Sequence, residues 1–423
     1  MRPNRPRPAA SGPPVEIIIE TVGGEGDGVA AGPIFAPFTL PGERVSVTGS
    51  GERRTLSAVL APSADRIAPV CPHFGTCGGC ALQHWAHEPY LAWKVERLAA
   101  TLLRQQIETE ILSAFVAGPG TRRRVALHAR RGTREAAKLG YKARKSWDLV
   151  DIEVCPISDP AIQAAIPAMK RLAAPLFEHP TSAPTLHVTL TAQGLDIDIS
   201  GVERKSGGLS ADARVLLAER GAEAGFARVT LDGEPAYLAR QPRVTLGPAT
   251  VALPAGAFLQ ATSQAEAAMT AFVGDQAEGA NRIADLFCGV GTFTFRLAQI
   301  AQTYAADAAP EAIRALTGAL AGAPGLKGVA AEARDLVRRP VLAEELRKTD
   351  VAVFDPPRAG AAEQTAELAR SSVARVIGVS CNPATFARDA RTLIDAGFRL
   401  DRVLPVDQFL WSPHIELVGV FSR

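Results

Sequence analysis

The stretch IADLFCGVGT, residues 283–292, decides how the C-terminal half of this 423-residue chain folds. Residues 283–288 read as a buried strand, and residues 293–300, which follow the glycines, read as a helix. Glycines between a strand and a helix allow a tight turn and a close approach of the backbone to a ligand. The spacing matches neither the dinucleotide fingerprint nor a P-loop with its lysine.

Strands and helices alternate from this stretch to the C-terminus. That alternation predicts a parallel, doubly wound α/β sheet, which binds ligands at the carboxyl ends of its strands. Asp307 ends the second strand, where an acid accepts hydrogen bonds from ribose hydroxyls, and Asp335 follows the third, where an acid holds an adenine amino group. The layout resembles the class I methyltransferase fold, and a Rossmann-like sheet for another nucleotide is the alternative. Strands are expected at residues 303–307, 351–355, 376–380 and 415–421, and helices at 310–320 and after each of the strands 351–355 and 376–380.

Three further segments are expected to meet above the same sheet edge: DPPRAG at 355–360, SCNP at 380–383 and HIE at 414–416. Methylation of uracil at C5 needs a cysteine that adds to C6 and a base that removes the C5 proton, and Cys381 and Glu416 supply these two residue types. A helix that starts at Cys381 would favour its thiolate. Taken alone, Cys381 is better read as a buried thiol of the core and Glu416 as a surface carboxylate, and the motif around Cys381 changes this reading. Cys288 is expected to be a packing residue.

The segments DLFCGVGT, DPPRAG, VSCNPATFARD and HIELV, in this order, resemble the bacterial RNA uracil-5 methyltransferases, and the similarity extends over nearly the whole chain. The resemblance implies that Cys381 is the nucleophile, that Glu416 is the base, and that Gln260 contacts S-adenosylmethionine. It also implies an N-terminal TRAM-like β-barrel that binds RNA. Thr292 stands where some relatives have Asn, and Asp307 where Glu is common; both keep a polar contact. The implied cofactor-pocket residues are Gln260, Phe287, Thr292, Asp307, Asp335 and Asp355, of which Asp355 also faces the uracil.

Four cysteines form a second pattern. Cys71, Cys77 and Cys80 lie in one loop, and Cys155 completes the set. Four thiolates suit either zinc or an iron–sulfur cluster, and the spacing leaves both open. It differs from the C-x3-C-x2-C of radical S-adenosylmethionine enzymes, so that class is rejected. The resemblance implies a [4Fe–4S] cluster and an rRNA substrate, because rRNA members of the family carry a cluster on this spacing and tRNA members typically lack it.

Composition limits the class of protein that this chain can be. Hydrophobic residues make up 47% of the chain, the net charge is +2, and no apolar run is long enough to span a membrane. The Arg- and Pro-rich N-terminus is not a signal peptide, so a cytoplasmic monomer is expected. The expected division is a disordered basic tail (1–14), a TRAM-like OB barrel (15–65), a central RNA-binding region with the iron–sulfur loop (66–245) and a methyltransferase domain (246–423). Strands at 15–20, 44–47, 125–130 and 185–191 and a helix at 89–107 are also expected.

A dense run of basic residues extends from Arg122 to Lys145 and is opposed in the sequence only by Glu135. It predicts a face that contacts phosphates, with a solvated surface as the alternative. RNA is therefore the expected partner, with 23S rRNA favoured, and no membrane is expected. The run consists of Arg122, Arg123, Arg124, Arg130, Arg131, Arg134, Lys138, Lys142, Arg144 and Lys145.

Other functions stay open on these residues. A uridine in the tRNA T-loop is an alternative substrate. Methylation of an exocyclic amine is a second chemistry, but its Asp-Pro-Pro motif usually continues with an aromatic residue, and Arg358 follows here. Cytosine C5 methylation places its cysteine in different surroundings. A non-catalytic RNA-binding assembly factor would bind RNA without methyl transfer.

Overall fold

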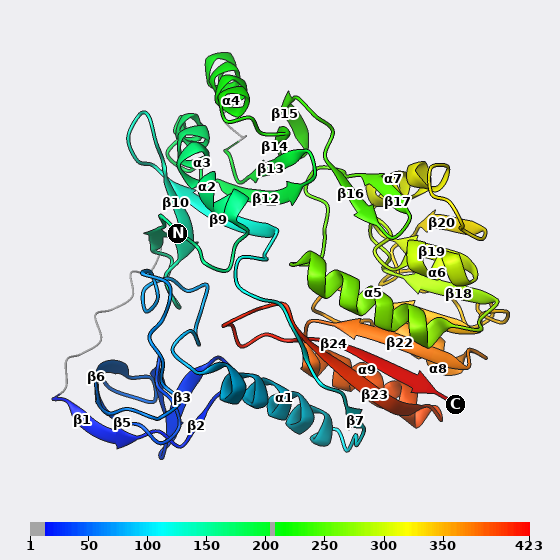
Figure 1. Cartoon of the computed structure of the whole chain (residues 1–423), viewed down its shortest axis with the longest axis horizontal. Coiled ribbons are helices and arrows are strands. Elements are labelled where there is room, and N and C mark those ends of the chain that lie inside the picture. Colours follow the sequence, from blue (N-terminus) through cyan, green and yellow to red (C-terminus); the bar gives the residue numbers. More distant parts are fainter. Residues whose placement is uncertain (1–12, 204–207) are drawn as a thin grey trace.

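The computed structural model describes residues 13–203 and 208–423. Of the expected basic tail, residues 1–14, only the last two lie within these ranges. The N-terminal strands, a central domain and a C-terminal α/β domain follow one another along the chain (Figure 1). No helix in the described ranges is long and apolar enough to cross a lipid bilayer.

The N-terminal region forms two small antiparallel sheets around a shared core. Ile19, Ala36 and Val45 are buried in that core. The strands expected at 15–20 and 44–47 are present, and the assignment to the TRAM type stays a prediction. One sheet has the order β1-β5-β6 and the other β2-β3-β4: β1 Val15–Ile18, β2 Thr21–Val22, β3 Asp27–Ala30, β4 Ile34–Pro37, β5 Arg44–Thr48 and β6 Thr55–Ala61.

The central domain is a mixed sheet of order β11-β10-β9-β12-β13-β14-β15 that is covered by helices. Leu127, Ile197, Met169 and Leu217 lie in its core, which forms between the sheet and the helices. The strands expected at 125–130 and 185–191 are confirmed as β9 and β12. The elements are β9 Arg124–Arg130, β10 Lys138–Lys142, β11 Leu149–Asp151, α2 Pro160–Ala164, α3 Ile166–Ala173, a 3₁₀ turn Ala174–Phe177, β12 Thr185–Thr191, β13 Gly194–Ser200, α4 Ala211–Glu223, β14 Arg228–Leu231 and β15 Glu234–Leu238. A hairpin, β16 Arg243–Leu246 and β17 Ala249–Ala252, leads to the last domain.

The C-terminal domain is the predicted doubly wound α/β sheet, in the order β20-β19-β18-β21-β22-β24-β23-β7. Helices α5 to α7 pack on one face, and α8, α9 and α1 pack on the other. The elements are α1 His87–Leu103, β7 Glu110–Ile111, β8 Phe115–Val116, α5 Ser263–Ala277, β18 Arg282–Leu286, α6 Thr294–Ile300, β19 Gln302–Asp307, α7 Pro310–Leu320, β20 Val329–Ala333, β21 Val351–Phe354, α8 Ala362–Arg370, β22 Arg375–Ser380, α9 Pro383–Asp395, β23 Arg399–Asp407 and β24 Glu416–Ser422.

Two expectations about this domain are corrected. The sheet is not wholly parallel, because β24 runs antiparallel to both β22 and β23. A short connection joins β23 to β24, and a hairpin can pair only in the antiparallel sense. The segment that contains α1, β7 and β8 was assigned to the central region, 66–245. It belongs to the C-terminal domain by packing, because β7 and β8 pair with β23 and α1 lies beside α9 (Figure 1).

Candidate functional site

The strand order brings the expected nucleophile and base together. Ser380, the last residue of β22, pairs with Leu417 of the antiparallel strand β24. Cys381 follows Ser380 in the chain, and Glu416 precedes Leu417. Because the two strands are antiparallel, the ladder places Cys381 and Glu416 side by side. Asp355 follows the neighbouring strand β21, whose Phe354 pairs with Gly378 of β22. The three residues lie at the carboxyl edge of the parallel strands, where the sequence predicted the site.

The two carboxyl groups of the site resist ionisation. Glu416 is only 4% exposed. Burial and the charge of Asp355 together raise its pKa to about 8, against a hydrogen bond from Gln408 and the charge of Arg358. Burial likewise raises the pKa of Asp355 to about 7, against a hydrogen bond from Gln260. Glu416 can therefore gain and lose a proton near neutral pH, as a general base must.

The thiol of Cys381 differs from expectation. Burial and the Glu416 carboxylate raise its pKa to about 11, although Arg358 lowers it. The helix α9 begins at Pro383, with Asn382 as its cap. The predicted stabilisation of the thiolate by this helix start is outweighed, because two carboxylates and a partly apolar setting surround the sulfur. If Cys381 is the nucleophile, its thiol would need a proton acceptor or a further cation beside it to ionise near neutral pH.

The glycine-rich stretch has the geometry of a ligand-binding turn. Phe287, directly after β18, has a φ of 63°, a left-handed conformation that is uncommon outside glycine and often marks a functional site. Asp307 at the end of β19 accepts hydrogen bonds from the backbone N–H of Gly289 at 2.9 Å and of Ala309 at 2.9 Å. Thr292 stands just before α6. Asp307 therefore links the turn after β18 to the turn after β19.

Gln260 and Asp335 have different surroundings. Gln260 is buried, and its Nε2 donates to Oδ2 of Asp355 at 3.1 Å. This hydrogen bond joins the expected cofactor-binding residue to the residues at the carboxyl edge of the sheet. Asp335 follows β20, and its Oδ1 accepts from the backbone N–H of Val337 and of Arg338. Its side chain makes no hydrogen bond to the other predicted site residues in the part of the chain that the structure describes. It instead stabilises the local turn of residues 335–338.

The charges of this edge fit a cationic ligand. Burial and the charges of Asp355 and Asp307 raise the pKa of Asp285 to about 7, against a hydrogen bond from Thr294, so the three carboxyl groups repel one another. One oxygen of Asp285, Oδ1, is buried without a hydrogen-bond partner among the described residues. S-adenosylmethionine carries a sulfonium and an ammonium group, so its binding would relieve this repulsion. The residues present therefore fit that ligand.

Two residues of the site were not predicted from the sequence. Gln408, directly after β23, hydrogen-bonds both Gln260 and Glu416. Phe258, two residues before Gln260, is 63% exposed, and the guanidinium of Arg124 lies 5.0 Å from its ring centroid. The position of Phe258 beside the Gln260 motif was the signal that could have revealed it. Gln408 had no comparable signal.

The four expected metal-binding cysteines line one cavity of about 280 Å³. Cys71, Cys77 and Cys80 come from the loop before α1, and Cys155 from the segment before α2. Burial and, to a smaller extent, the three other cysteines raise the pKa of the Cys80 thiol to about 12, against a hydrogen bond with Gln83. Within the described ranges no three His, Cys, Asp or Glu side chains form a group that could hold a metal ion. A cubane cluster needs no such tight group, because each thiolate binds a different iron. Cys288, as expected, is buried in a core cluster.

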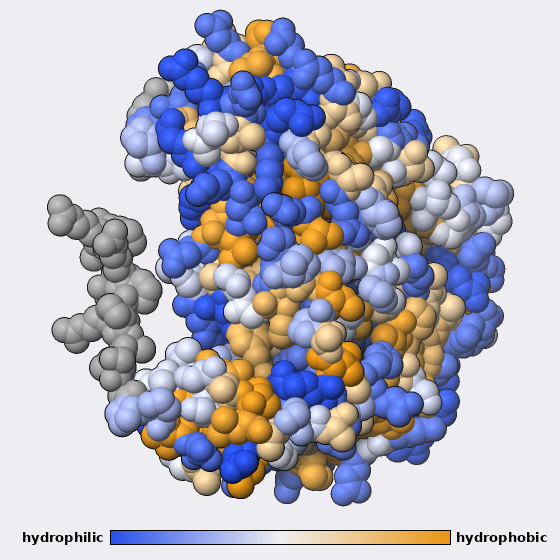
Figure 2. Space-filling model, turned by 60° about the vertical axis from the view of Figure 1, so that its left-hand side comes forward, coloured by the Kyte–Doolittle hydropathy of each residue, from blue (hydrophilic) through white to orange (hydrophobic). Residues whose placement is uncertain are grey.

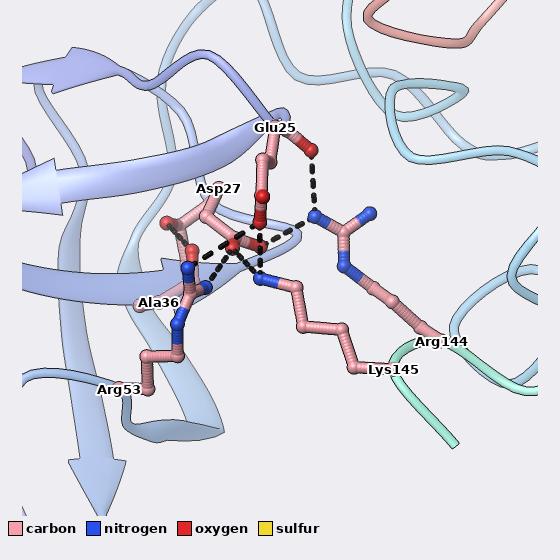
Figure 3. Close-up of polar contacts among 7 residues, drawn as sticks. Glu25, Asp27, Ala36, Arg53, Arg144 and Lys145 are labelled. Atoms are coloured by element: carbon pink, nitrogen blue, oxygen red, sulfur yellow. Dashed lines mark hydrogen bonds and ion pairs between the residues drawn. The ribbon is translucent and has the colours of Figure 1, made fainter. Parts of the chain in front are cut away.

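The basic run is only partly available for RNA. Arg144 and Lys145 bind the buried carboxylate of Asp27, at 2.6 Å and 2.9 Å, and Arg53 binds it from the N-terminal strands (Figure 3). Arg123 pairs with Glu266 at 2.6 Å. The expectation that only Glu135 opposes the run is wrong in three dimensions, because distant acids neutralise part of it. Arg124 and Lys142 instead lie against the exposed aromatic rings of Phe258 and Trp147.

Comparison with known proteins agrees with this geometry. A family model described as tRNA (Uracil-5-)-methyltransferase matches residues 328–423. An uncharacterized RNA methyltransferase of Caulobacter vibrioides is 62% identical over 96% of this chain and 100% of its own. The 23S rRNA (uracil(1939)-C(5))-methyltransferase RlmD of Chromohalobacter salexigens is 32% identical over 96% of this chain and 89% of its own. The tRNA (uracil-54, C5)-methyltransferase of Pyrococcus abyssi, solved with S-adenosyl-L-homocysteine, has the same fold, with a TM-score of 0.70, 22% identity and coverage of 96% and 100%.

Proposed function

The chain belongs to the RNA (uracil-5-)-methyltransferase family and is an S-adenosylmethionine-dependent enzyme, and from this premise we propose that it methylates C5 of a uridine in 23S rRNA through a covalent bond between Cys381 and C6. The observation that supports this most directly is the strand register, which pairs Ser380 with Leu417 and so brings a thiol next to a buried carboxyl group. A cysteine nucleophile and a carboxylate base are the two residue types that this chemistry uses.

The residues of the site divide the reaction between them. Cys381 gives its proton to the neighbouring Asp355 carboxylate, and the thiolate adds to C6 of the uracil, so that C5 becomes a nucleophile. When bound, S-adenosylmethionine would supply the methyl group to C5 and leave as S-adenosylhomocysteine. The Glu416 carboxylate then removes the C5 proton, the bond between sulfur and C6 breaks, and the thiolate recovers its proton from Asp355. The positive charge of Arg358, which lowers the pKa of Cys381, favours the thiolate throughout.

Gln260, Phe287, Thr292, Asp307, Asp335 and Asp355 are the residues that we propose to hold S-adenosylmethionine. Asp307 is the most strongly supported of them, since its two oxygens accept from the backbone N–H of Gly289, in the turn after β18, and of Ala309, in the turn after β19. The mutual repulsion among Asp285, Asp307 and Asp355 also supports a cationic ligand.

The expected RNA-binding surface carries exposed aromatic rings, each with a cationic side chain beside it. Bases of unpaired RNA stack on exposed aromatic side chains, and neighbouring cations bind the phosphates. Phe258 with Arg124 and Trp147 with Lys142 have this arrangement, and Nζ of Lys142 lies 3.9 Å from the ring centroid of Trp147. The molecule is hollowed between the central domain above and the N-terminal strands below (Figure 2), which leaves room for a polynucleotide.

We further propose that Cys71, Cys77, Cys80 and Cys155 hold a [4Fe–4S] cluster. All four thiols line one cavity, and a donor set of four cysteines suits such a cluster. When bound, the cluster would crosslink the loop of residues 71–80 to the central domain. Its chemistry would be structural, since the methyl transfer needs no electron.

The test is methyl transfer to defined RNA. Protein purified without oxygen is incubated with labelled S-adenosylmethionine and, separately, with protein-free 23S rRNA and tRNA. Label in 5-methyluridine of the rRNA is expected from the wild type, and none from Cys381→Ala. The exposed Glu363→Gln serves as a control for Glu416→Gln. Glu416→Gln should give a methylated RNA–protein adduct that survives denaturing electrophoresis.

The results separate the candidate functions. Label in tRNA alone would keep the chemistry and replace rRNA with tRNA, the substrate class named by the family model; a T-loop uridine would then be the first position to examine. Turnover by Cys381→Ala would overturn the covalent route. Tight RNA binding with no label in any RNA would favour a non-catalytic assembly factor.

A further inference from the structure

Gln408 uses its whole amide group inside the site. Its Nε2 donates to Oε1 of Gln260 at 2.8 Å and to Oε2 of Glu416 at 2.8 Å, and its Oε1 accepts from the backbone N–H of Ala261 at 2.9 Å. The side chain is only 3% exposed. Its orientation is unambiguous, because the flipped amide would place an oxygen against two acceptors and an NH₂ against an N–H.

These bonds join the base to the cofactor side of the site. Gln260, which receives one hydrogen bond from Gln408, donates its own Nε2 to Asp355 at 3.1 Å. A continuous chain of hydrogen bonds therefore runs from Glu416 through Gln408 and Gln260 to Asp355. The backbone of Ala261 fixes the middle of that chain.

The base is otherwise poorly held in its ionised form. Burial and the negative charge of Asp355 both disfavour the Glu416 carboxylate. The thiol of Cys381 becomes a third negative charge nearby when it ionises. The charge of Arg358 and the hydrogen bond from the Gln408 amide oppose them, and Gln408 donates directly to a carboxylate oxygen.

The backbone of Gln408 is itself anchored. The preceding residue, Asp407, is completely buried and accepts from Tyr90 and Lys94 of α1, each at 2.7 Å. Lys94 also donates to the backbone carbonyl of Phe409 at 3.2 Å. The residues on both sides of Gln408 are thus hydrogen-bonded to α1.

We propose that Gln408 is a positioning residue, which holds the Glu416 carboxylate toward the uracil C5 and couples its placement to Gln260 on the cofactor side. This inference rests on the proposed role of Glu416 as the base. Loss of the amide should leave C6 addition and methyl transfer largely intact and slow the removal of the C5 proton.

Two variants and a matched control test the role. Gln408→Met removes the donors at similar volume, and Gln408→Glu keeps the shape but cannot donate when ionised. Gln364→Met is the control, because Gln364 is equally buried and bonds only the backbone of Val341, through its Oε1 at 2.8 Å and its Nε2 at 3.0 Å. The measurements are the pH dependence of kcat, the KM for S-adenosylmethionine, and the fraction of RNA held as methylated adduct on denaturing gels.

For both Gln408 variants we expect kcat at pH 7 to fall about 10- to 100-fold, as for the loss of a hydrogen bond to a charged group. The acid limb of the kcat profile should move about one to two pH units upward, and adduct should accumulate at neutral pH and clear at higher pH. Gln364→Met should show none of these changes. An unchanged acid limb and no adduct in either Gln408 variant would overturn the inference, provided that Glu416→Gln traps adduct. If Glu416→Gln turns over normally, the proposed function fails instead.

Discussion

Nζ of Lys94 lies 2.7 Å from Oδ1 of Asp407, and both side chains are fully buried. The pair joins α1 to the end of β23, directly before the residue that holds the proposed base. Burial lowers the pKa of Lys94 to about 8, although Asp407 opposes that change. A buried pair of this kind contributes little over an apolar pair, but the loss of one partner leaves an uncompensated charge.

Lys94→Met should therefore lower the free energy of unfolding by about 3 to 5 kcal/mol, because Asp407 would remain buried with Tyr90 as its chief side-chain donor. Urea unfolding at neutral pH measures the change. Arg399→Ala is the comparison, since Arg399 is 81% exposed in its pair with Asp401 and should cost less than about 1 kcal/mol. An equal decrease in the free energy of unfolding in the two variants would show that the buried pair contributes no more to stability than the exposed pair.

Glu416→Gln should stabilise the protein at alkaline pH. The folded pKa of Glu416, about 8, is above its ordinary value of 4.5. The folded state therefore binds more protons than the unfolded state between these values, and the ionised carboxylate costs stability that grows as pH rises through this window. At pH 9 we expect a gain of roughly 1 to 3 kcal/mol over the wild type. Near pH 4.5 the two proteins should unfold at similar denaturant concentrations; a gain at that pH as large as at pH 9 would contradict the assignment.

The alternation of strand and helix was enough to predict the C-terminal domain. The helix expected at 310–320 is α7, Pro310–Leu320. Local apolar patterns define such elements, but they do not define strand order, and the insertion of β24 between β22 and β23 depends on pairing across the sheet. The motifs identified Cys381 and Glu416, whereas Gln408 was missed because its partner Gln260 is 148 residues away. Arg144 likewise seemed free in the sequence, since Asp27 precedes it by 117 residues.

Phe258→Ala should reduce kcat/KM for RNA about 10- to 100-fold, the cost of losing one base stacked on an aromatic ring. Binding of S-adenosylmethionine should not change, since Phe258 faces solvent. Leu238→Ala is the matched control, because Leu238 is 52% exposed and lies on β15, at the edge of the central sheet away from β11. Steady-state kinetics on an rRNA fragment decide the result, and equal values for the two variants would remove Phe258 from the RNA surface.

Trp147→Ala should weaken RNA affinity with little effect on kcat. Trp147 is 74% exposed beside Lys142, in the connection between β10 and β11, outside the catalytic group. An increase in Kd of up to about tenfold, measured by fluorescence anisotropy, is expected from the loss of one stacking surface. An unchanged Kd at low and moderate salt would show that this surface does not meet the RNA.

Asp27→Asn should loosen the contact between the N-terminal strands and the central domain. Asp27 is 4% exposed, and Arg53, Arg144 and Lys145 all bind its carboxylate. Burial raises the pKa of Asp27, but these cations outweigh it and hold the pKa below its ordinary value of 3.8. The stability that the ionised group contributes is present above pH 3.8 and lost as pH falls through the lower folded value.

We expect Asp27→Asn to cost about 2 to 4 kcal/mol at pH 7, because three cations would surround a neutral amide. Glu25→Gln is the control, since Glu25 is 65% exposed in the same cluster and should cost less than about 1 kcal/mol. Thermal unfolding and limited proteolysis near residues 143–148 give independent readings. The interpretation fails if both substitutions change the midpoint equally.

Cys155→Ser should abolish the cluster and lower stability, because Cys155 is the one thiol of the four that comes from the central domain. Wild-type protein purified without oxygen should contain four iron atoms and four acid-labile sulfides per chain, as a [4Fe–4S] cluster requires, with broad absorption in the visible range. Cys288→Ser is the control, since Cys288 is buried in a different core cluster and should retain the iron. One zinc atom per chain with no labile sulfide would keep the thiol site and replace its metal. Full iron content in Cys155→Ser would remove Cys155 from the ligand set, and the loop of residues 71–80 would then have no covalent link to the central domain.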